Sequence, residues 1–244
     1  MKFAIKSIVA ATAFVAAGVA SAALVTVNAG PTLSGSGALT FSENLRDALN
    51  VGSVAVSAFG GATSSIVGSA GSYSDITVGA PVVSVTYDDV TNQVTRVVTA
   101  GGARQVAGNV AGVSGGGWVE VGNLDVNLVT KEIFGTVVGQ SLSGVSVNFS
   151  GKLFDIASIT GDTTYQPGTA LTQLTGLALT TAGFNEIKKA LDLKLLGTAA
   201  LQAAAEDFGV INSTITVAVP EPSTYALMGL GLVGLALARR RAAK

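Results

Sequence analysis

Residues 81–99 read PVVSVTYDDVTNQVTRVVT. From Val83 to Tyr87 every second residue is apolar or aromatic, and the residues between them are Ser and Thr. This is the period-2 pattern of a strand with one buried face. Residues 93–99 are again rich in Val and Thr, which favour strands. The connection DDVTN at 88–92 consists largely of turn-forming residues, so the stretch predicts an antiparallel β-hairpin.

The same pattern extends in both directions from this hairpin. Short runs rich in Val, Ile, Leu and Thr alternate with clusters of Gly, Ser, Asn and Asp. Further strands are expected at Val51–Ala58, Ser65–Val67, Ile76–Val78, Trp118–Val121, Leu124–Val129, Ile133–Val138, Ser143–Phe149, Leu174–Leu179 and Ile211–Val217. Many short strands with turn signals between them predict a mainly β, antiparallel domain, either a sandwich or barrel-like.

Three segments depart from the strand pattern. Thr181–Leu196 places Ile187 and Leu191 on one apolar stripe, opposite several lysines, which is typical of an amphipathic helix. Phe41–Leu49 follows the potential cap Thr40 and has helical spacing, and Leu201–Phe208 is long enough for a turn or two. The domain is therefore expected to carry one to three short helices.

The N-terminus predicts export from the cytoplasm. Lys2 and Lys6 are followed by an apolar stretch that ends at Ala20, and Ala20 and Ala22 are small residues around a cleavage point. This is the pattern of a secretory signal peptide, so we expect the Sec machinery and signal peptidase to process the chain. The mature protein would then begin at Ala23.

The C-terminal tail has three parts in a fixed order. They are the segment Val219-Pro220-Glu221-Pro222, an uncharged run from Tyr225 to Ala238, and the cluster Arg239-Arg240-Arg241. Prolines disfavour a helix in the first part. Arginine clusters tend to stay on the cytoplasmic side of a membrane, so the last part predicts a stop at the inner membrane. As a helix, the uncharged run covers roughly 21 Å, which is short of a hydrocarbon core of about 30 Å.

This tail resembles the PEP-CTERM sorting signal of exported Gram-negative proteins. The resemblance covers residues 219–244 and includes every part of the signal in order. It implies that an exosortase, an integral-membrane cysteine-type transpeptidase-like enzyme, recognises and removes the tag. It also implies a host that makes an exopolysaccharide or biofilm matrix. The alternative is an ordinary C-terminal membrane anchor. The short transmembrane helix disfavours it, because the helix is shorter than the hydrocarbon core of the bilayer.

The chain therefore divides into a signal peptide (1–22), a secreted β-rich domain (23–218) and a sorting tag (219–244). Six of the 14 basic residues and one of the 15 acidic ones lie in the two ends. Eight basic and fourteen acidic residues remain between them, so the mature domain carries a net charge of about −6. An acidic domain without a basic stripe is a poor nucleic-acid binder, and none is expected as a partner.

The chain contains neither Cys nor His. This excludes disulfides, thiol nucleophiles and thiolate metal sites, and it removes the commonest general base. Asp88, Asp89 and Asn92 could offer oxygen ligands to Ca²⁺, but they lack the loop pattern of a calcium site, and turn chemistry explains them better. No metal or cofactor is expected.

Two further features were weighed as sites. Trp118, the sole Trp, is a candidate for stacking on a sugar ring, although a single Trp more often lies in a core. Glu132, Asp155 and Asp162 could supply the paired carboxylates of a glycoside hydrolase, but nothing in their spacing places two of them on one face.

The leading hypothesis is a non-enzymatic surface or exopolysaccharide-matrix protein, held briefly at the inner membrane and then sorted by an exosortase. Exopolysaccharide itself is a candidate partner. The alternative is an extracytoplasmic module that binds a glycan or another small ligand. A carboxylate-dependent hydrolase ranks below both.

Overall fold

The computed structural model describes residues 23–218 and 228–232. The predicted signal peptide, the Pro-Glu-Pro segment and the arginine cluster lie outside these residues. The elements occur in the order β1 (Leu24–Asn28), β2 (Leu33–Phe41), α1 (Glu43–Val51), β3 (Ala55–Phe59), β4 (Thr63–Val67), β5 (Asp75–Asp88), β6 (Val94–Thr99), β7 (Gly102–Ala107), β8 (Gly117–Asn127), β9 (Glu132–Ser141), β10 (Ser146–Gly161), β11 (Gly168–Leu179), α2 (Thr181–Ala190), α3 (Leu195–Ala205) and β12 (Gly209–Val217).

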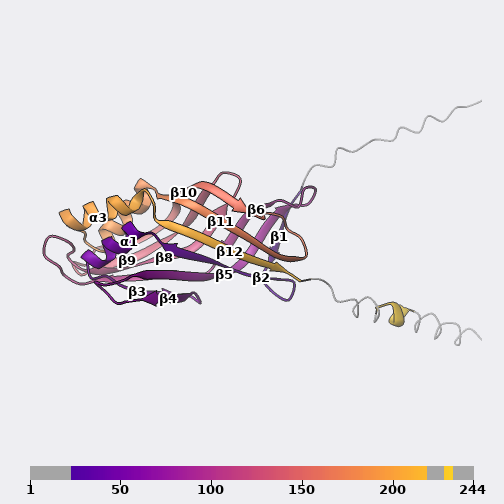
Figure 1. Ribbon diagram of the computed structural model, residues 1–244, viewed down its shortest axis with the longest axis horizontal. Coiled ribbons are helices and arrows are strands. Elements are labelled where there is room, and N and C mark those ends of the chain that lie inside the picture. Colours follow the sequence, from indigo (N-terminus) through magenta and orange to yellow (C-terminus); the bar gives the residue numbers. More distant parts are fainter. Residues whose placement is uncertain (1–22, 219–227, 233–244) are drawn as a thin grey trace, which may run out of the picture.

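Eight strands form a closed antiparallel barrel (Figure 1). The ring runs β5-β2-β12-β11-β10-β9-β8-β6 and closes because β6 pairs with both β8 and β5. The remaining strands extend its wall: β1 and β4 pair with β5, and β3 and β7 continue outward from β8. The mainly β prediction is confirmed, and of its two architectures the barrel is the one formed.

The predicted hairpin is formed by β5 and β6, with one difference in phase. Val82 and Val85 are buried, whereas Val83 is 38% exposed. The β5–β6 register shifts between Val82 and Ser84, and this irregularity exchanges the two faces of the strand. The predicted alternation, which placed Val83 on the buried face together with Val85, is therefore wrong at Val83, because the buried face of the preceding part of the strand carries Val82.

The strands predicted at Ile76–Val78 and Pro81–Tyr87 are one continuous strand, β5. Pro81 lies where this strand changes partners. Before it, β5 pairs with β4 and β2, and after it, with β6 and β1. Proline has no N–H to donate to a ladder, so a change of partners is a position where it fits within a strand.

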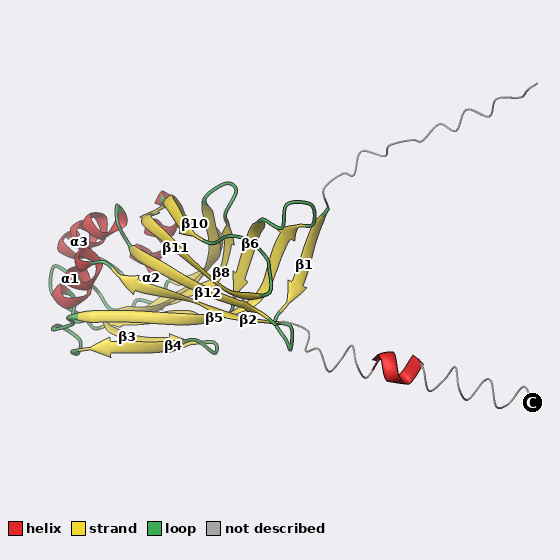
Figure 2. Ribbon diagram, turned by 45° about the vertical axis from the view of Figure 1, so that its right-hand side comes forward, coloured by secondary structure: helices red, strands yellow, loops and turns green. Residues whose placement is uncertain are grey.

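The helices gather at one end of the barrel, at the left in Figures 1 and 2. α1 begins after Ser42 and α2 after Thr180, and each of these hydroxyls accepts a hydrogen bond from the first turn. The helix predicted at Thr181–Leu196 is confirmed from Thr181 to Ala190, where α2 ends. Its predicted extension to Leu196 is wrong, because Asp192 has a φ of 47°, which interrupts the helix. α3 then begins at Leu195 and includes much of the predicted third helix.

α2 packs closely on the β8–β9 wall. Ala190 is fully buried where Gly117 and Gly139 lack side chains. A Cβ at Gly139 would lie 2.8 Å from the Cβ of Ala190, and one at Gly117 would lie 2.2 Å from its carbonyl oxygen. Below the helices, the rings of Phe154 and Phe208 lie 4.9 Å apart in the core. The helices therefore close this end of the barrel with apolar packing.

The two described chain ends leave the barrel at its opposite end (Figure 2). Ala218 follows β12 directly and its N–H donates to the carbonyl of Thr32 at 3.0 Å. Ala23 precedes β1 and is held at the end of β5 by Asp89. Within residues 23–218 and 228–232, no helix has the length and apolarity to cross a membrane, and most of the predicted tail helix falls outside these residues.

Candidate functional site

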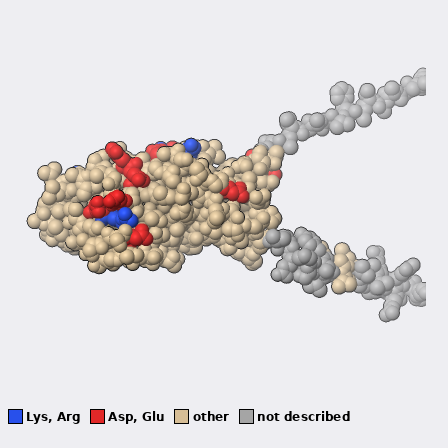
Figure 3. Space-filling model, viewed as in Figure 1, with Lys and Arg blue, Asp and Glu red and all other residues tan. Residues whose placement is uncertain are grey.

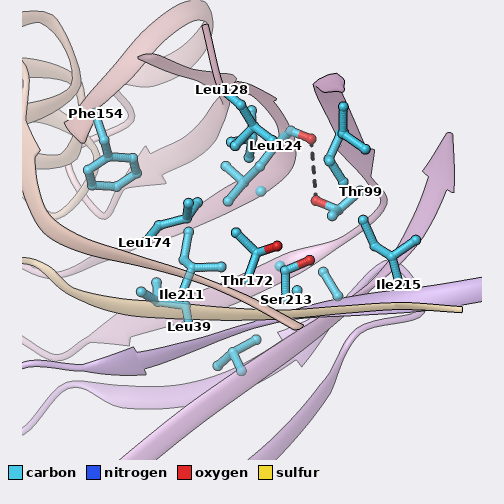
Figure 4. A pocket seen from close by; sticks show the side chains of 18 of the residues that line it. Leu39, Thr99, Leu124, Leu128, Phe154, Thr172, Leu174, Ile211, Ser213 and Ile215 are labelled. Atoms are coloured by element: carbon cyan, nitrogen blue, oxygen red, sulfur yellow. Dashed lines mark hydrogen bonds between the residues drawn. The ribbon is translucent and has the colours of Figure 1, made fainter. Parts of the chain in front are cut away.

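The barrel encloses a cavity in its middle (Figure 4). The centre of a water molecule could occupy any point within about 80 Å³ of this cavity without touching its walls. One buried water needs at least about 10–15 Å³ on this measure, so the space exceeds a packing defect several times over. A more open groove on the outer wall, lined by residues such as Ser36, Thr63 and Pro81, has about 420 Å³ on the same measure. The barrel cavity is the more enclosed of the two and is considered as a site for that reason.

The walls of this cavity are predominantly apolar. Five strands and the segment after β8 contribute the large side chains that Figure 4 shows around it: Leu39, Leu124, Leu128, Phe154, Leu174, Ile211 and Ile215. Small residues such as Gly37 and Ala170 leave the space between them open. Such a lining excludes water and favours apolar ligands.

Besides the buried amide of Gln105 on β7 and the polar residues 162–165 at the mouth, three hydroxyl-bearing residues interrupt the apolar lining. Thr172 on β11 lies opposite Ser213 on β12, and Ser213 in turn lies opposite Gly37 on β2. Thr99 on β6 lies beside this row, since a Cβ at Gly37 would be 3.7 Å from its methyl group. We call Thr99, Thr172 and Ser213 the hydroxyl belt.

The members of the hydroxyl belt differ in their free hydrogen-bonding capacity. Thr172 Oγ1 donates to the carbonyl of Asp162 at 2.5 Å, and Thr99 Oγ1 donates to that of Leu124 at 3.3 Å. Their protons are thus committed, and each offers a lone pair. Ser213 Oγ is buried and has no hydrogen-bond partner among the described residues. Buried polar groups are normally paired, so this hydroxyl is an exception that requires an explanation.

The mouth at the end opposite the helices is crossed by residues 162–167, which connect β10 to β11 and which we call the strap. Its Thr163 carbonyl accepts from Val94 N–H at 2.7 Å, and its Tyr165 N–H donates to the carbonyl of Asn92 at 2.7 Å. β6 lies four strands around the ring from β11. The strap therefore spans the barrel from one wall to the opposite one.

Asp162 is the one charged group among the described residues that line the cavity. Hydrogen bonds from the hydroxyl and backbone N–H of Thr164 hold the pKa of its carboxyl below the usual range, with a further contribution from Gln166. At neutral pH the described residues that line the cavity therefore contribute one negative charge, from Asp162, and no positive one.

Two of the predicted carboxylates are brought together on the outer wall. Glu132 and Asp155 face each other across β9 and β10, which their sequence spacing did not reveal. Lys152 Nζ lies between them, 3.0 Å from Glu132 and 2.7 Å from Asp155. The hydrogen bond from Lys152 lowers the pKa of Glu132, followed by that from Thr130. A glycosidase acid needs a raised pKa, so the pair has the chemistry of an ion-pair network.

Trp118 is half-buried on β8 and has a partner on its ring. The guanidinium of Arg104 lies 4.5 Å from the ring centroid and donates to Glu120 at 2.8 Å. A cation over an aromatic face is a stabilising contact in itself. A sugar stacking on Trp118 would have to use the other face of the ring. Tyr73 is buried and its hydroxyl accepts from Val56 N–H, so its ring is not available at the surface to join Trp118 in binding a sugar.

The hairpin connection uses its polar residues locally. Asp88 Oδ1 accepts from the N–H groups of Val90 and Thr91, and these backbone hydrogen bonds help lower its pKa. Asn92 adopts a φ of 57°, which Asn tolerates. These contacts are those of a turn, and no group of acids able to hold a metal ion occurs among the described residues.

The hydroxyl belt is not among the sites predicted from the sequence, although its signal is visible there. On β12 the inward phase reads Ile211, Ser213, Ile215 and Val217, and on β11 Ala170, Thr172 and Leu174. A hydroxyl in phase with an apolar stripe marks an interior polar position. Reading each strand for such exceptions would have singled out both residues.

A single comparison with known proteins gave a match. Residues 218–241 match the model of the PEP-CTERM protein-sorting motif, which confirms the resemblance drawn from the tail. No curated protein and no solved structure matches the chain. The chain thus carries the sorting motif of an exported, exosortase-processed protein behind a barrel that the motif does not include.

Proposed function

We propose that this chain is a non-enzymatic surface or exopolysaccharide-matrix protein of a Gram-negative bacterium, which its PEP-CTERM motif delivers for exosortase processing. The observation that carries the proposal is where the motif begins. β12 ends at Val217 and the motif match starts at residue 218. Removal of the tag would take away none of the twelve strands or three helices of the barrel.

The arrangement of the chain ends supports the same route. Ala23 and Ala218 leave the same end of the barrel, and the helices cover the other end (Figure 2). A chain attached to the inner membrane through either terminus would present the same end of the barrel to the membrane. Cleavage of signal peptide and tag would release the barrel without rearrangement.

The non-enzymatic part rests on how the polar groups are used. Glu132 and Asp155 are bound by Lys152. Ser114 is buried, donates to the carbonyl of Leu191 and accepts from Gly116 N–H, so its hydroxyl serves the loop that contains it. On the face shown in Figure 3, charged side chains are sparse and basic ones form no stripe. A surface with few charges on this face suits contact with a neutral polysaccharide.

The sorting route is tested by the mass of the exported protein. Val219, Pro220, Glu221 and Pro222 are replaced together by Ala, and Ser223 and Thr224 are replaced in a matched control. The wild type and the control should lose the C-terminal segment, whereas the motif variant should keep it and remain with the inner membrane. A wild-type protein recovered from the cell surface with an intact C-terminus contradicts the proposal.

The non-enzymatic role is tested in a strain that lacks the protein. Cohesion of the matrix should be restored by the wild type and equally by a double variant with E132Q and D155N, provided that the variant is exported in equal amount. A variant that is exported and folded but restores nothing would indicate that these carboxylates perform chemistry.

A further inference from the structure

We propose that the barrel interior binds one neutral, largely apolar molecule that carries a single hydroxyl or carbonyl group. This ligand site is separate from the surface role and does not depend on it. The ligand would enter through the mouth that the strap crosses and would place its polar group at the hydroxyl belt.

The first argument is the unfilled volume. Protein interiors are packed about as densely as organic crystals, and voids larger than a water molecule are few. The barrel nevertheless leaves about 80 Å³ open to the centre of a water molecule between Leu39, Leu174 and Ile211. Gly37 contributes to this space, because a Cβ there would meet its nearest neighbours only at 3.7–3.8 Å. The backbone at residue 37 could therefore carry a larger side chain that would fill part of the cavity, so the fold does not require the cavity to be empty.

The second argument is the buried hydroxyl of Ser213. It points into the cavity beside Thr172 (Figure 4), and its Oγ has no partner among the described residues. Thr172 and Thr99 have donated their protons to backbone carbonyls and offer lone pairs. A ligand hydroxyl can accept from Ser213 and donate to a neighbouring Thr, and a ligand carbonyl can accept from Ser213. The hydroxyl belt therefore matches one such group.

The third argument is charge, which sets the class of ligand. The described residues lining the cavity include no Lys or Arg, and Asp162 at the mouth is ionised at neutral pH. A carboxylate inside would be desolvated without a cation and repelled by Asp162. The carboxylate oxygens of Asp162 already accept from Thr164 and Gln166, so it is poorly placed to hold an amine. Neutral alcohols, aldehydes or ketones remain as the class that fits.

The strap supplies the route of entry. It is fixed by two backbone hydrogen bonds to the β5–β6 hairpin and by the stacked rings of Tyr87 and Tyr165. The helical end is closed by side chains packed around Ala190 and Phe208. The mouth is crossed by this single segment, which Thr163 Oγ1 also joins to Gln93, whereas the other end is filled by packed side chains; we therefore place the route of entry at the mouth.

The experiment uses the mature protein recovered after export and the neutral fluorescent probe N-phenyl-1-naphthylamine. The wild type should bind the probe, and decan-1-ol should displace it at a concentration at least tenfold lower than decanoate at pH 8. Gly37→Val, which fills the cavity, should reduce probe affinity at least tenfold. Gly79→Val is the matched control, because Gly79 lies on β5 opposite Ala38 and a Cβ there would face Thr63 on the outer wall.

The role of the belt is tested by Ser213→Ala. This variant should keep probe binding and lose most of the preference for decan-1-ol over decanoate. If Gly37→Val fails to fold, as judged by its thermal unfolding, Ala170→Leu fills the same cavity from β11. The proposal is overturned if the wild type does not bind the probe, if filling the cavity leaves affinity unchanged, or if decanoate competes as well as decan-1-ol.

Discussion

The rings of Tyr87 and Tyr165 are stacked, with their centroids 4.2 Å apart and an angle of 7° between their planes. Tyr87 belongs to β5 and Tyr165 to the strap, so the pair joins two opposite parts of the barrel wall across its mouth. Burial raises the pKa of the Tyr165 hydroxyl, and the neighbouring Tyr87 adds to the effect. The Tyr165 hydroxyl therefore stays neutral throughout the physiological range, and the two rings hold the strap by apolar and aromatic contact.

We expect Tyr165→Ala to loosen the strap. An aromatic pair contributes about 0.5–1.5 kcal/mol beyond its buried area. In a domain of this size each 1 kcal/mol corresponds to a fall in Tm of about 2–4 °C. Bound N-phenyl-1-naphthylamine should dissociate several-fold faster, as measured by stopped-flow dilution. Tyr165→Phe keeps the ring and should behave as the wild type; if Tyr165→Ala releases the probe at the wild-type rate, the strap does not control the mouth.

A second prediction concerns the packing of α2 against the β8–β9 wall. Gly139→Ala would place a Cβ 2.4 Å from the carbonyl oxygen of Trp118 and 2.8 Å from the Cβ of Ala190. Both neighbours are fixed by packing, so we expect a loss of about 1–3 kcal/mol in the free energy of unfolding, measured by urea denaturation. Gly37→Ala meets nothing closer than 3.7 Å and is the control. Equal stability of the two variants would show that α2 can move away from the wall.

The sequence predicted the class of fold because its strongest strands carry a regular polar-apolar alternation. It did not predict β2, whose sequence LSGSGALTF is dominated by Ser and Gly. This strand is specified by its neighbours, since β12 pairs with its whole length and β5 with half of it. The closure of the barrel could not be predicted from the sequence either. It depends on the pairing of β6 with β8, and these two strands are separated by β7 along the chain.

The tail was predictable because a sorting signal is read from the chain itself. The cavity was not, since it exists only where eight strands and the strap meet. Individual signals were nevertheless present, such as Ser213 within the apolar phase of β12. The position of Glu132 opposite Asp155 depends on the β9–β10 register, which their distance of 23 residues along the chain does not reveal.

Stability should depend on pH through the strap. The carboxyl of Asp162 has a pKa below its usual value of 3.8, chiefly because the hydroxyl of Thr164 donates to it. A carboxylate of this kind stabilises the fold above the pKa of the unfolded chain, and the contribution is lost as the pH falls through the lower folded value. We expect the Tm of the wild type to fall below about pH 4 more steeply than that of Asp162→Asn.

The comparison needs a matched control because other carboxylates also titrate in this range. Asp47→Asn on the exposed face of α1 removes one carboxylate without touching the strap. Its Tm should follow the wild type from pH 6 to pH 2, measured by circular dichroism. A wild-type curve parallel to that of Asp162→Asn would mean that the Asp162–Thr164 contact does not stabilise the strap.

The last prediction concerns the new N-terminus. The N–H of Ala23 donates to Asp89 Oδ1 at 2.8 Å, and the N–H of Asp89 donates to the carbonyl of Ala23 at 3.1 Å. Cleavage before Ala23 would turn that N–H into an ammonium group beside a carboxylate and create an ion pair. Because the pair is exposed, Asp89→Asn should cost about 0.2–1 kcal/mol of unfolding free energy in low salt. At 1 M salt, where the Debye length is about 3 Å, the difference in unfolding free energy between the variant and the wild type should largely vanish.

N-terminal sequencing of the exported protein checks whether the mature chain begins at Ala23. Two outcomes contradict the pairing: a mature chain that starts elsewhere, and an Asp89→Asn variant that is as stable as the wild type in low salt.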